Sequence, residues 1–207
     1  MTEETILEGY VGHADVAQGS RAVSRFDRQS GLLTSGVHGK YGQLSSEGKV
    51  FFAASQAATT WSVALTTTYT GLMVWNPASS TVNLRLQQVA FALSVAPAAI
   101  APVGLILGGP TTDLATNGTP LSVYNTKTGA AISTAGRGKA SAGCTLTLAP
   151  IWGPMLVGGF TAAALFSHGG LVDLEEAFTI PPGHFAGIGA LTAAVGFGYM
   201  SWTETPV

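Results

Sequence analysis

The chain has 207 residues, a formal net charge of −2 at pH 7 and a pI of about 6.0. Its length suits one large domain, alone or with an arm, and allows a sizeable core. The nine Lys and Arg residues are scattered, which excludes the basic stripe of a non-specific nucleic-acid binder. The single cysteine, Cys144, excludes an internal disulfide, and the acidic N-terminus predicts no secretory signal.

Charged residues are concentrated near the N-terminus. Eleven of the twenty lie at positions 1–50, which leaves nine for the other 157 positions. Because globular chains usually carry about a quarter charged residues, the rest of the chain is strongly depleted. Three stretches, 86–112, 140–172 and 177–203, have no charge at all. A soluble monomer needs charged surface to stay dispersed, so this body either buries much of its surface against other chains or meets a membrane.

No membrane-spanning helix is expected in these uncharged stretches. A spanning helix needs about 20 consecutive apolar residues. The stretches are also rich in Ser, Thr and Gly, and prolines interrupt them at positions 97, 102, 150, 154, 181 and 182. We therefore favour an oligomer with large interfaces, and we expect neither a membrane nor nucleic acid as a partner.

The N-terminal segment, 1–48, differs in composition from the body, 49–207. It is polar, contains few apolar residues and is punctuated by eight glycines. Such a segment buries too little apolar surface to order itself alone. We predict an extended arm or loop-rich lobe that becomes ordered against a neighbour, with a flexible tail as the alternative for the first 20 residues.

The stretch 50–109 contains the clearest strand pattern. Apolar residues at 50–54 and a Thr-rich segment leading into 71–75 suit a pleated, half-buried surface. Asn76 and Pro77 open a turn at 76–80. Apolar and polar residues then alternate at 82–86, as in a strand with one buried face. The two flanking segments predict a β-hairpin or a strand–turn–strand unit.

The alternation changes phase within the next segment. After position 86 the apolar residues occupy odd positions, as at Val89 and Phe91. A one-residue slip exchanges the buried face of a strand. We therefore predict a bulge or bend near Gln87 and Gln88, or a change of packing partner there.

Short apolar segments separated by turn residues continue to the C-terminus. They lie at 103–107, 121–124, 144–148, 171–172, 178–180, 185–188, 191–195 and 197–202, and 155–166 suits a strand or a short helix. Pro182 and Gly183 suit the centre of a type II turn. About eight to ten short strands without a long helix predict an all-β fold, for which we favour a jelly-roll-like β-sandwich with an extended N-terminal arm.

No convincing catalytic or metal-binding constellation is present. The histidines lack metal-ligand spacing, so solvated loop positions are the simpler interpretation for all four: His13, His38, His168 and His184. Asp173, Glu175 and Glu176 form the only acidic cluster, which we compare with calcium ligands and general acids. We prefer a strand edge whose charges discourage edge-to-edge pairing. The sequence therefore predicts no enzyme, no cofactor and no metal.

Other motifs also have plain structural interpretations. The run 136–139, Gly-Arg-Gly-Lys, offers contacts to phosphate or carboxylate, but an exposed loop is preferred. Residues 187–189 begin like a dinucleotide fingerprint but lack its third glycine, which favours a closely packed strand. Asn117 opens a glycosylation sequon that we expect to be unused. Trp75 and Trp202 suit core or interface packing, with a sugar-binding platform as the alternative.

Several of these segments, taken together, resemble a family of tailed-bacteriophage virion proteins. The resemblance rests on 39–42, Gly-Lys-Tyr-Gly; on 48–54, with its Gly-Lys-Val-Phe start; on 66–72, ending in Thr-Gly-Leu; on the Trp-Asn-Pro of 75–77; and on 180–183 with the terminal 201–207. It covers 39–108 and 178–207. The chain departs from the family pattern at Gly42, where a second aromatic residue is expected, and at 45–47.

This resemblance implies a trimeric jelly-roll protein, made in the host cytoplasm, on the outer surface of the capsid. It would act as a decoration or cement protein whose partners are its own copies and the major capsid protein. One alternative is a trimeric receptor-binding spike or tail-fibre knob that binds glycans through Trp75 or Trp202. Another is a hydrolase on a β-scaffold, for which Asp173, Glu175 and Glu176 are the available carboxylates.

Overall fold

The computed structural model describes residues 8–10, 21–23, 41–61, 65–95, 97–109, 118–127, 138–160 and 169–207. The chain divides into two compact units, Met1–Tyr41 and Gly42–Val207. The first contains β1 (Glu8–Tyr10) and β2 (Arg21–Val23), which pair antiparallel. The second, called the body here, begins with the short helix α1 (Gly42–Ser46). The boundary expected from sequence, after residue 48, lies on the other side of α1.

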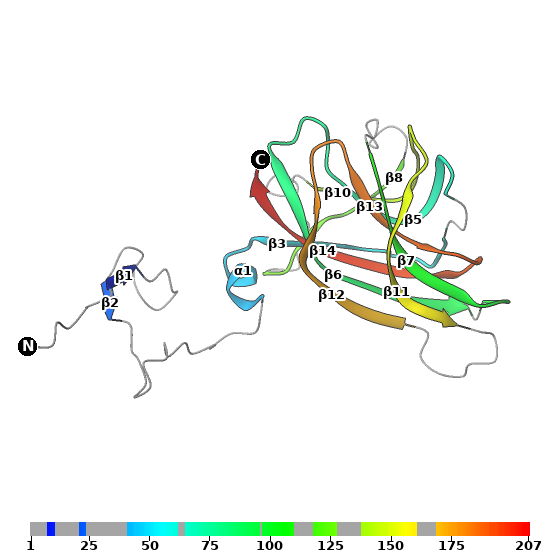
Figure 1. The fold of residues 1–207 in the computed structure, drawn as a ribbon, viewed down its shortest axis with the longest axis horizontal. Coiled ribbons are helices and arrows are strands. Elements are labelled where there is room, and N and C mark those ends of the chain that lie inside the picture. Colours follow the sequence, from blue (N-terminus) through cyan, green and yellow to red (C-terminus); the bar gives the residue numbers. More distant parts are fainter. Residues whose placement is uncertain are drawn as a thin grey trace, which may run out of the picture. The chain divides into compact units, whose positions relative to one another are not determined.

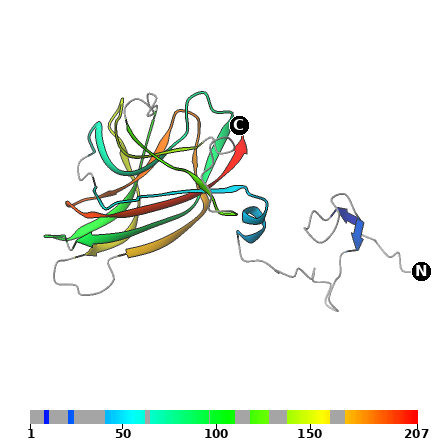
Figure 2. The same ribbon diagram turned by 180° about the vertical axis from the view of Figure 1, so that it is seen from behind.

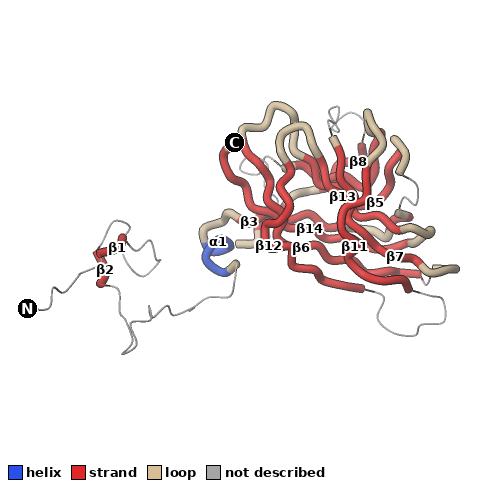
Figure 3. The backbone as a smooth tube through the Cα atoms, in the orientation of Figure 1, coloured by secondary structure: helices blue, strands red, loops and turns tan. Residues whose placement is uncertain are grey.

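The body consists almost entirely of strands (Figures 1 and 3). They are β3 (Val50–Ala54), β4 (Thr59–Thr60), β5 (Thr68–Trp75), β6 (Val82–Val95), β7 (Ala101–Gly108), β8 (Gly118–Leu121), β9 (Tyr124–Asn125), β10 (Lys139–Thr145), β11 (Ile151–Phe160), β12 (Gly169–Ile180), β13 (Phe185–Ala190) and β14 (Val195–Pro206). Sheet I has the order β12-β6-β14-β3-β9, with β4 also beside β14, and sheet II has the order β11-β7-β13-β5-β10-β8. The predicted all-β sandwich is confirmed.

The principal strands pair in a nested order. β7 pairs with β11, β6 with β12, β5 with β13, and β3 with β14, each pair antiparallel. The inner pairs are thus closer in sequence than the outer ones, and successive pairs alternate between sheet II and sheet I. The first and last strands of the body therefore lie side by side in sheet I, as Figure 2 also shows from behind.

The hydrophobic core fills the space between the sheets. Leu84 and Leu86 of β6, Met200 and Trp202 of β14, and Ile188 of β13 are almost fully buried in one continuous cluster. Alternation along β6 accounts for this arrangement, because Asn83 and Arg85 alternate with the buried Val82, Leu84 and Leu86 and are more exposed. Period-2 patterning therefore decides which face of sheet I is buried.

The predicted bulge in β6 is confirmed. On the β14 side, Gln88 pairs with Ser201 and Leu86 with Trp202, so Gln87 has no opposite residue. The β12 side also shifts register there, between Asp173 and Phe178. The strand keeps both neighbours through the bulge. As expected for a one-residue insertion, the buried positions change phase, from even numbers before the bulge to odd numbers after it.

β5 and β6 form the predicted strand–turn–strand unit, but they are not a hairpin because they lie in different sheets. Asn76 stabilises the turn by which the chain passes from β5 in sheet II to β6 in sheet I. Its Nδ2 donates to Val82 O at 2.7 Å and to Ile180 O at 3.0 Å, and its backbone bonds the nearby turn through His184 and Gly183. Gly183 has a φ of 81°, and His184 N donates to the Pro181 carbonyl. These features match the predicted type II turn.

The outer face of sheet II carries a second buried cluster, made of Tyr69, Met73, Trp75, Ile106, Cys144, Leu146 and Phe185. Segment 146–150 helps to cover it. Leu146 N donates to Thr67 O at one end of sheet II, and Pro150 approaches Gly108 at the other end. This connection between β10 and β11 therefore crosses the outer face of the sheet and closes the cluster.

Some predicted strand limits are wrong. Residues 191–194 form a bend and loop between β13 and β14, because Leu191 N and Ala194 O bond neighbouring segments, Pro102 and Trp61. The predicted strand 121–124 is interrupted between β8 and β9, and β10 ends at Thr145 before the crossing segment begins. Within 155–166, the described part continues β11 as a strand up to Phe160.

Candidate functional site

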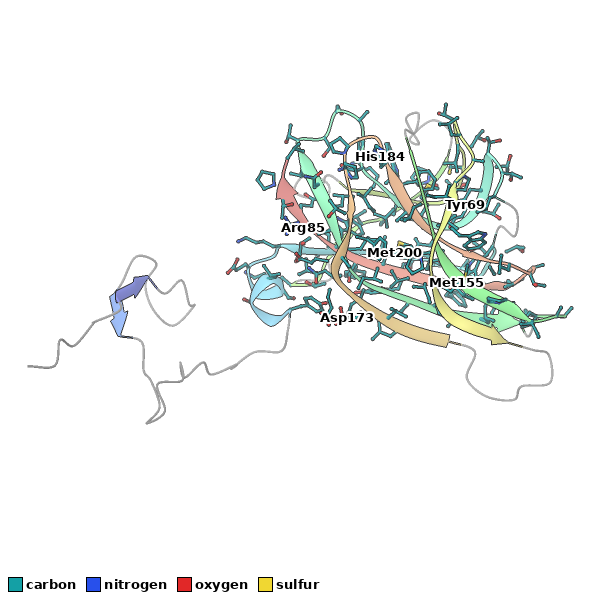
Figure 4. All side chains as sticks on the ribbon, in the orientation of Figure 1. Tyr69, Arg85, Met155, Asp173, His184 and Met200 are labelled. Atoms are coloured by element: carbon teal, nitrogen blue, oxygen red, sulfur yellow. The ribbon has the colours of Figure 1, made fainter. Side chains whose placement is uncertain are left out.

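The acidic cluster lies on β12, an edge strand of sheet I, as predicted. Asp173 and Glu175 are exposed, and Asp173 Oδ1 accepts a hydrogen bond from Glu175 N at 3.1 Å. Glu176 instead turns toward the sheet, where its Oε2 lies 3.3 Å from Nη1 of Arg85, a residue labelled in Figure 4. The three carboxylates therefore do not converge on one point.

The Glu176 carboxylate closes the bulge of β6. Gln87 Nε2 donates to Glu176 Oε1 at 2.6 Å, and Thr203 Oγ1 donates to the same oxygen at 3.2 Å. Gln87 is 1% exposed, so the bond from its Nε2 satisfies a donor that would otherwise be buried at a cost, while its Oε1 has no hydrogen-bond partner among the described residues. Both Glu175 and Glu176 have left-handed backbone, with φ of 51° and 64°. The bulge on β12 thus places Glu176 over the bulge on β6.

The contacts of Glu176 join three strands of sheet I, β12, β6 and β14. Glu176 is engaged by a guanidinium, an amide and a hydroxyl, so its two oxygens bind neighbours on β6 and β14. Within the described residues, no group of three or more His, Cys, Asp or Glu side chains is placed to hold a metal ion. Of the four histidines expected in solvated loops, His184 is described. Its Nδ1 lies 3.0 Å from the Pro182 carbonyl in an exposed turn. His13, His38 and His168 lie outside the described residues.

Trp75 and Trp202 are buried, so the alternative of a sugar-binding platform on these rings is wrong. Trp202 is 0% exposed in the central core, and Trp75 belongs to the covered cluster on sheet II. Burial follows from their positions. Along each strand the Trp alternates with smaller or more polar neighbours. Trp202 therefore points into the central core, and Trp75 points into the covered cluster on sheet II.

The glycines at 187 and 189 belong to a closely packed strand, as predicted. Both lie on β13, where the Tyr69 ring covers Gly187 and the Trp152 ring covers Gly189. In the Gly-Arg-Gly-Lys run, Gly138 is buried against Trp202 and Lys139 is exposed at the start of β10, while positions 136 and 137 lie outside the described residues. Asn117 of the sequon also lies outside them.

Sequence reasoning missed the role of Tyr69. Its hydroxyl accepts a hydrogen bond from Ile188 N at 3.1 Å and lies 2.7 Å from Leu72 O and 2.8 Å from Ile188 O. The pairing of β5 with β13 ends at Met73 and Gly187, just before Leu72 and Ile188, so the hydroxyl takes the place of ladder hydrogen bonds. Burial raises the pKa of Tyr69 well above its usual range. Gly71, with φ of 124°, leaves room for the ring.

Four of the nine exposed large apolar side chains of the described residues lie on or beside the edge strands β11 and β12, which contact each other. We call this part of the body the β11–β12 side. Ile151 and Leu171 are each 64% exposed, Leu148 is 56% exposed and Met155 is 46% exposed. A groove of about 360 Å³ also joins the two strands, between Leu148, Ile151, Phe178, Ile180, Pro181 and His184. Alternation predicts that some residues of these strands face outward, but not that the outward ones are apolar.

Aromatic rings gather near the opposite edge of sheet I, on its outer face. The Phe52 ring lies between Tyr124, at a centroid distance of 5.4 Å, and Tyr199, at 5.7 Å. All three side chains are partly buried. We call this edge, with Phe52, Tyr124 and the adjoining Lys49 and Lys127, the β3–β9 side.

Within the described residues, none of the helices has the length and apolar character needed to cross a membrane. The arrangement offers two chemically distinct surfaces, one aliphatic and acidic, the other aromatic and basic, on a body otherwise poor in charge.

The chain matches no protein-family model, no curated protein and no solved structure.

Proposed function

We propose that this protein is a structural component of a tailed-phage virion, a homotrimer that decorates the outer surface of the head and stabilises contacts between major capsid protein subunits. The observation that carries this proposal is the exposed apolar surface of a charge-poor body. Residues 51–207 carry nine charged side chains, while Leu148, Ile151, Met155 and Leu171 stand exposed on or beside the edge strands β11 and β12. Such a surface is typical of a chain that is buried against other subunits.

The nested strand pairing supports the finer fold assignment. An eight-strand order in which the first strand pairs with the last, the second with the seventh, and so on inward suits a jelly roll, the architecture of many viral capsid domains. This part of the argument is an analogy from fold, and a fold alone does not assign a function. The apolar surface adds the independent physical reason.

Small contacts suffice for a cement role when they are repeated. Burial of apolar surface contributes about 25 cal/mol per Å², and a trimer that engages three neighbouring sites gains avidity because the second and third contacts are intramolecular. The sequence resemblance over 39–108 and 178–207 supports the same role. The N-terminal unit, Met1–Tyr41, is separate from the body and suits an arm that reaches adjacent capsid subunits.

The rival functions have less support. A glycan-binding spike that uses Trp75 or Trp202 would need their rings at the surface, and both are buried. A hydrolase would need two carboxylates at a common centre, and Glu176 is turned onto Arg85 and Gln87 instead.

The copy number of this chain in purified particles tests the proposal. Quantitative mass spectrometry should find this chain in simple proportion to the most abundant shell protein. A protein that covers a symmetric shell should be present at on the order of hundreds of copies per particle. A handful of copies would instead indicate a vertex spike or tail component. Absence from the particles would refute the virion role.

A further inference from the structure

The two sides of the body differ in charge as well as in apolar chemistry. On the β11–β12 side, Asp173 and Glu175 are exposed beside Leu171. On the β3–β9 side, Lys127 is exposed and its side chain approaches Gly48, next to Lys49. Lys49 Nζ lies 2.6 Å from Glu47 Oε2, so two lysines stand against one carboxylate and the edge has a net positive charge. β12 and β9 are the two edges of sheet I, so about four strand spacings, or ~19 Å, separate the acidic edge from the basic edge.

We propose that copies of this chain associate head to tail, with the β11–β12 side of one copy against the β3–β9 side of the next. The contact joins exposed aliphatic side chains, Leu171 and Met155 among them, to the aromatic group of Phe52 and Tyr124. Asp173 and Glu175 meet Lys49 and Lys127 at its rim. An apolar centre with a charged rim is the usual anatomy of a protein interface.

Charge complementarity favours a second copy in this orientation. In a two-fold dimer built on one of these sides alone, that side meets its own copy, so acidic edges would face acidic edges or basic edges would face basic edges, which is unfavourable. A head-to-tail contact instead brings opposite charges together at every interface. Contacts of this kind form a closed ring when the rotation between neighbours allows it. The inference deepens the proposed homotrimer and rests on it for the number of copies.

Charge reversal tests the contact directly in the full-length protein. Light scattering after size-exclusion chromatography should give a trimer for the wild type. The pair D173K/E175K places positive charge against the basic side, and the pair K49E/K127E places negative charge against the acidic side. Each pair should raise the dissociation constant of self-association by roughly tenfold or more. The quadruple variant carries both reversals, restores opposite charges across each contact, and should recover the trimer.

Lys139→Glu is the matched control, because it makes the same kind of charge change at an exposed position of sheet II. It should leave the mass unchanged. Circular dichroism and the thermal midpoint establish that every variant is folded. A monomeric wild type, a trimer that survives both reversed pairs, or a folded quadruple variant that stays dissociated would overturn the proposed contact.

A second variant tests the apolar centre. Ile151→Ser combined with Met155→Ser replaces two exposed side chains, so it should weaken self-association with little effect on the thermal midpoint of the dissociated chain. Unchanged self-association would contradict the contact. These outcomes are separate from the particle test. If the wild type is a trimer that the variants do not weaken, the proposed contact is wrong, but the copy number of the protein in particles is unaffected and still tests the virion role.

Discussion

At the scale of single residues, the Tyr69 hydroxyl completes the seam between β5 and β13. It bonds Ile188 N and lies within hydrogen-bonding distance of two carbonyls, and its single proton serves one of them at a time. Tyr69→Phe would keep the ring over Gly187 but leave a buried N–H without its acceptor. We expect a loss of about 1–3 kcal/mol in the free energy of unfolding, measured with urea. Tyr199→Phe, on a half-buried ring, is the control; an equal loss there would contradict the special role of Tyr69.

The buried thiol of Cys144 gives a pH dependence. Burial raises its pKa from 9.0 to about 12, so the folded protein keeps the thiol proton at a pH where the unfolded chain loses it. The stabilisation is therefore fully present below pH 9 and is lost as the pH rises toward 12. Between neutral pH and about pH 10, the wild type should lose roughly 1 kcal/mol more stability than Cys144→Ala.

Urea unfolding of both proteins at the two pH values measures this difference. Tyr69 titrates in the same direction at higher pH, since burial also raises its pKa, but it is present in both proteins and cancels. Equal losses in the wild type and in Cys144→Ala would show that the thiol does not contribute.

At the scale of elements, the bulge on β12 carries a backbone cost. Glu175 is exposed and adopts a left-handed conformation, which glycine tolerates better than other residues. Glu175→Gly should therefore be more stable than Glu175→Ala by roughly 1 kcal/mol, because both remove the carboxylate and only the glycine relieves the strain. The thermal midpoints of the two variants provide the measurement. If alanine proves as stable as glycine, the left-handed backbone is not strained.

The same elements show what the sequence could predict. The bulge at Gln87 followed from the phase of apolar residues along one strand, and the turn at Gly183 followed from local turn chemistry, so both depended on neighbours in sequence. The separation of β5 and β6 into different sheets did not, because it depends on Asn76 bonding Ile180, far along the chain. Tyr69 was missed for the same reason. Its partner Ile188 lies on another strand, and an isolated Tyr in a strand segment carries no signal of that contact.

At the scale of the whole molecule, the succession of short apolar segments predicted an all-β body, which the strands confirm. The scarcity of charge predicted a surface buried against other chains, and that stays a prediction. Composition could not tell which faces would stay exposed. Ile151 and Trp152 are adjacent in sequence and equally apolar, but Ile151 is largely exposed while Trp152 packs against Gly104 and Gly189. That difference arises from strand order in sheet II, in which β11 is an edge.

The division of the chain after Tyr41 leads to a last prediction, made with two deletions. Removing 1–41 takes away one compact unit and leaves the body whole. Removing 1–48 also takes away α1, whose Ser45 hydroxyl lies 2.7 Å from Thr126 Oγ1, and the Gly48 carbonyl, which accepts from Asn125 Nδ2 at 2.6 Å. These bonds hold β9 at the edge of sheet I.

We expect the shorter deletion to leave the unfolding of the body unchanged and the longer one to cost roughly 1–3 kcal/mol, by urea titration. Under the proposed function, the shorter deletion should also bind purified particles more weakly than the full chain in a sedimentation assay, because the arm contacts are lost while the body is intact. Equal destabilisation by both deletions would mean that the first unit supports the body. Full binding by the shorter deletion would mean that the body alone supplies the attachment to the capsid.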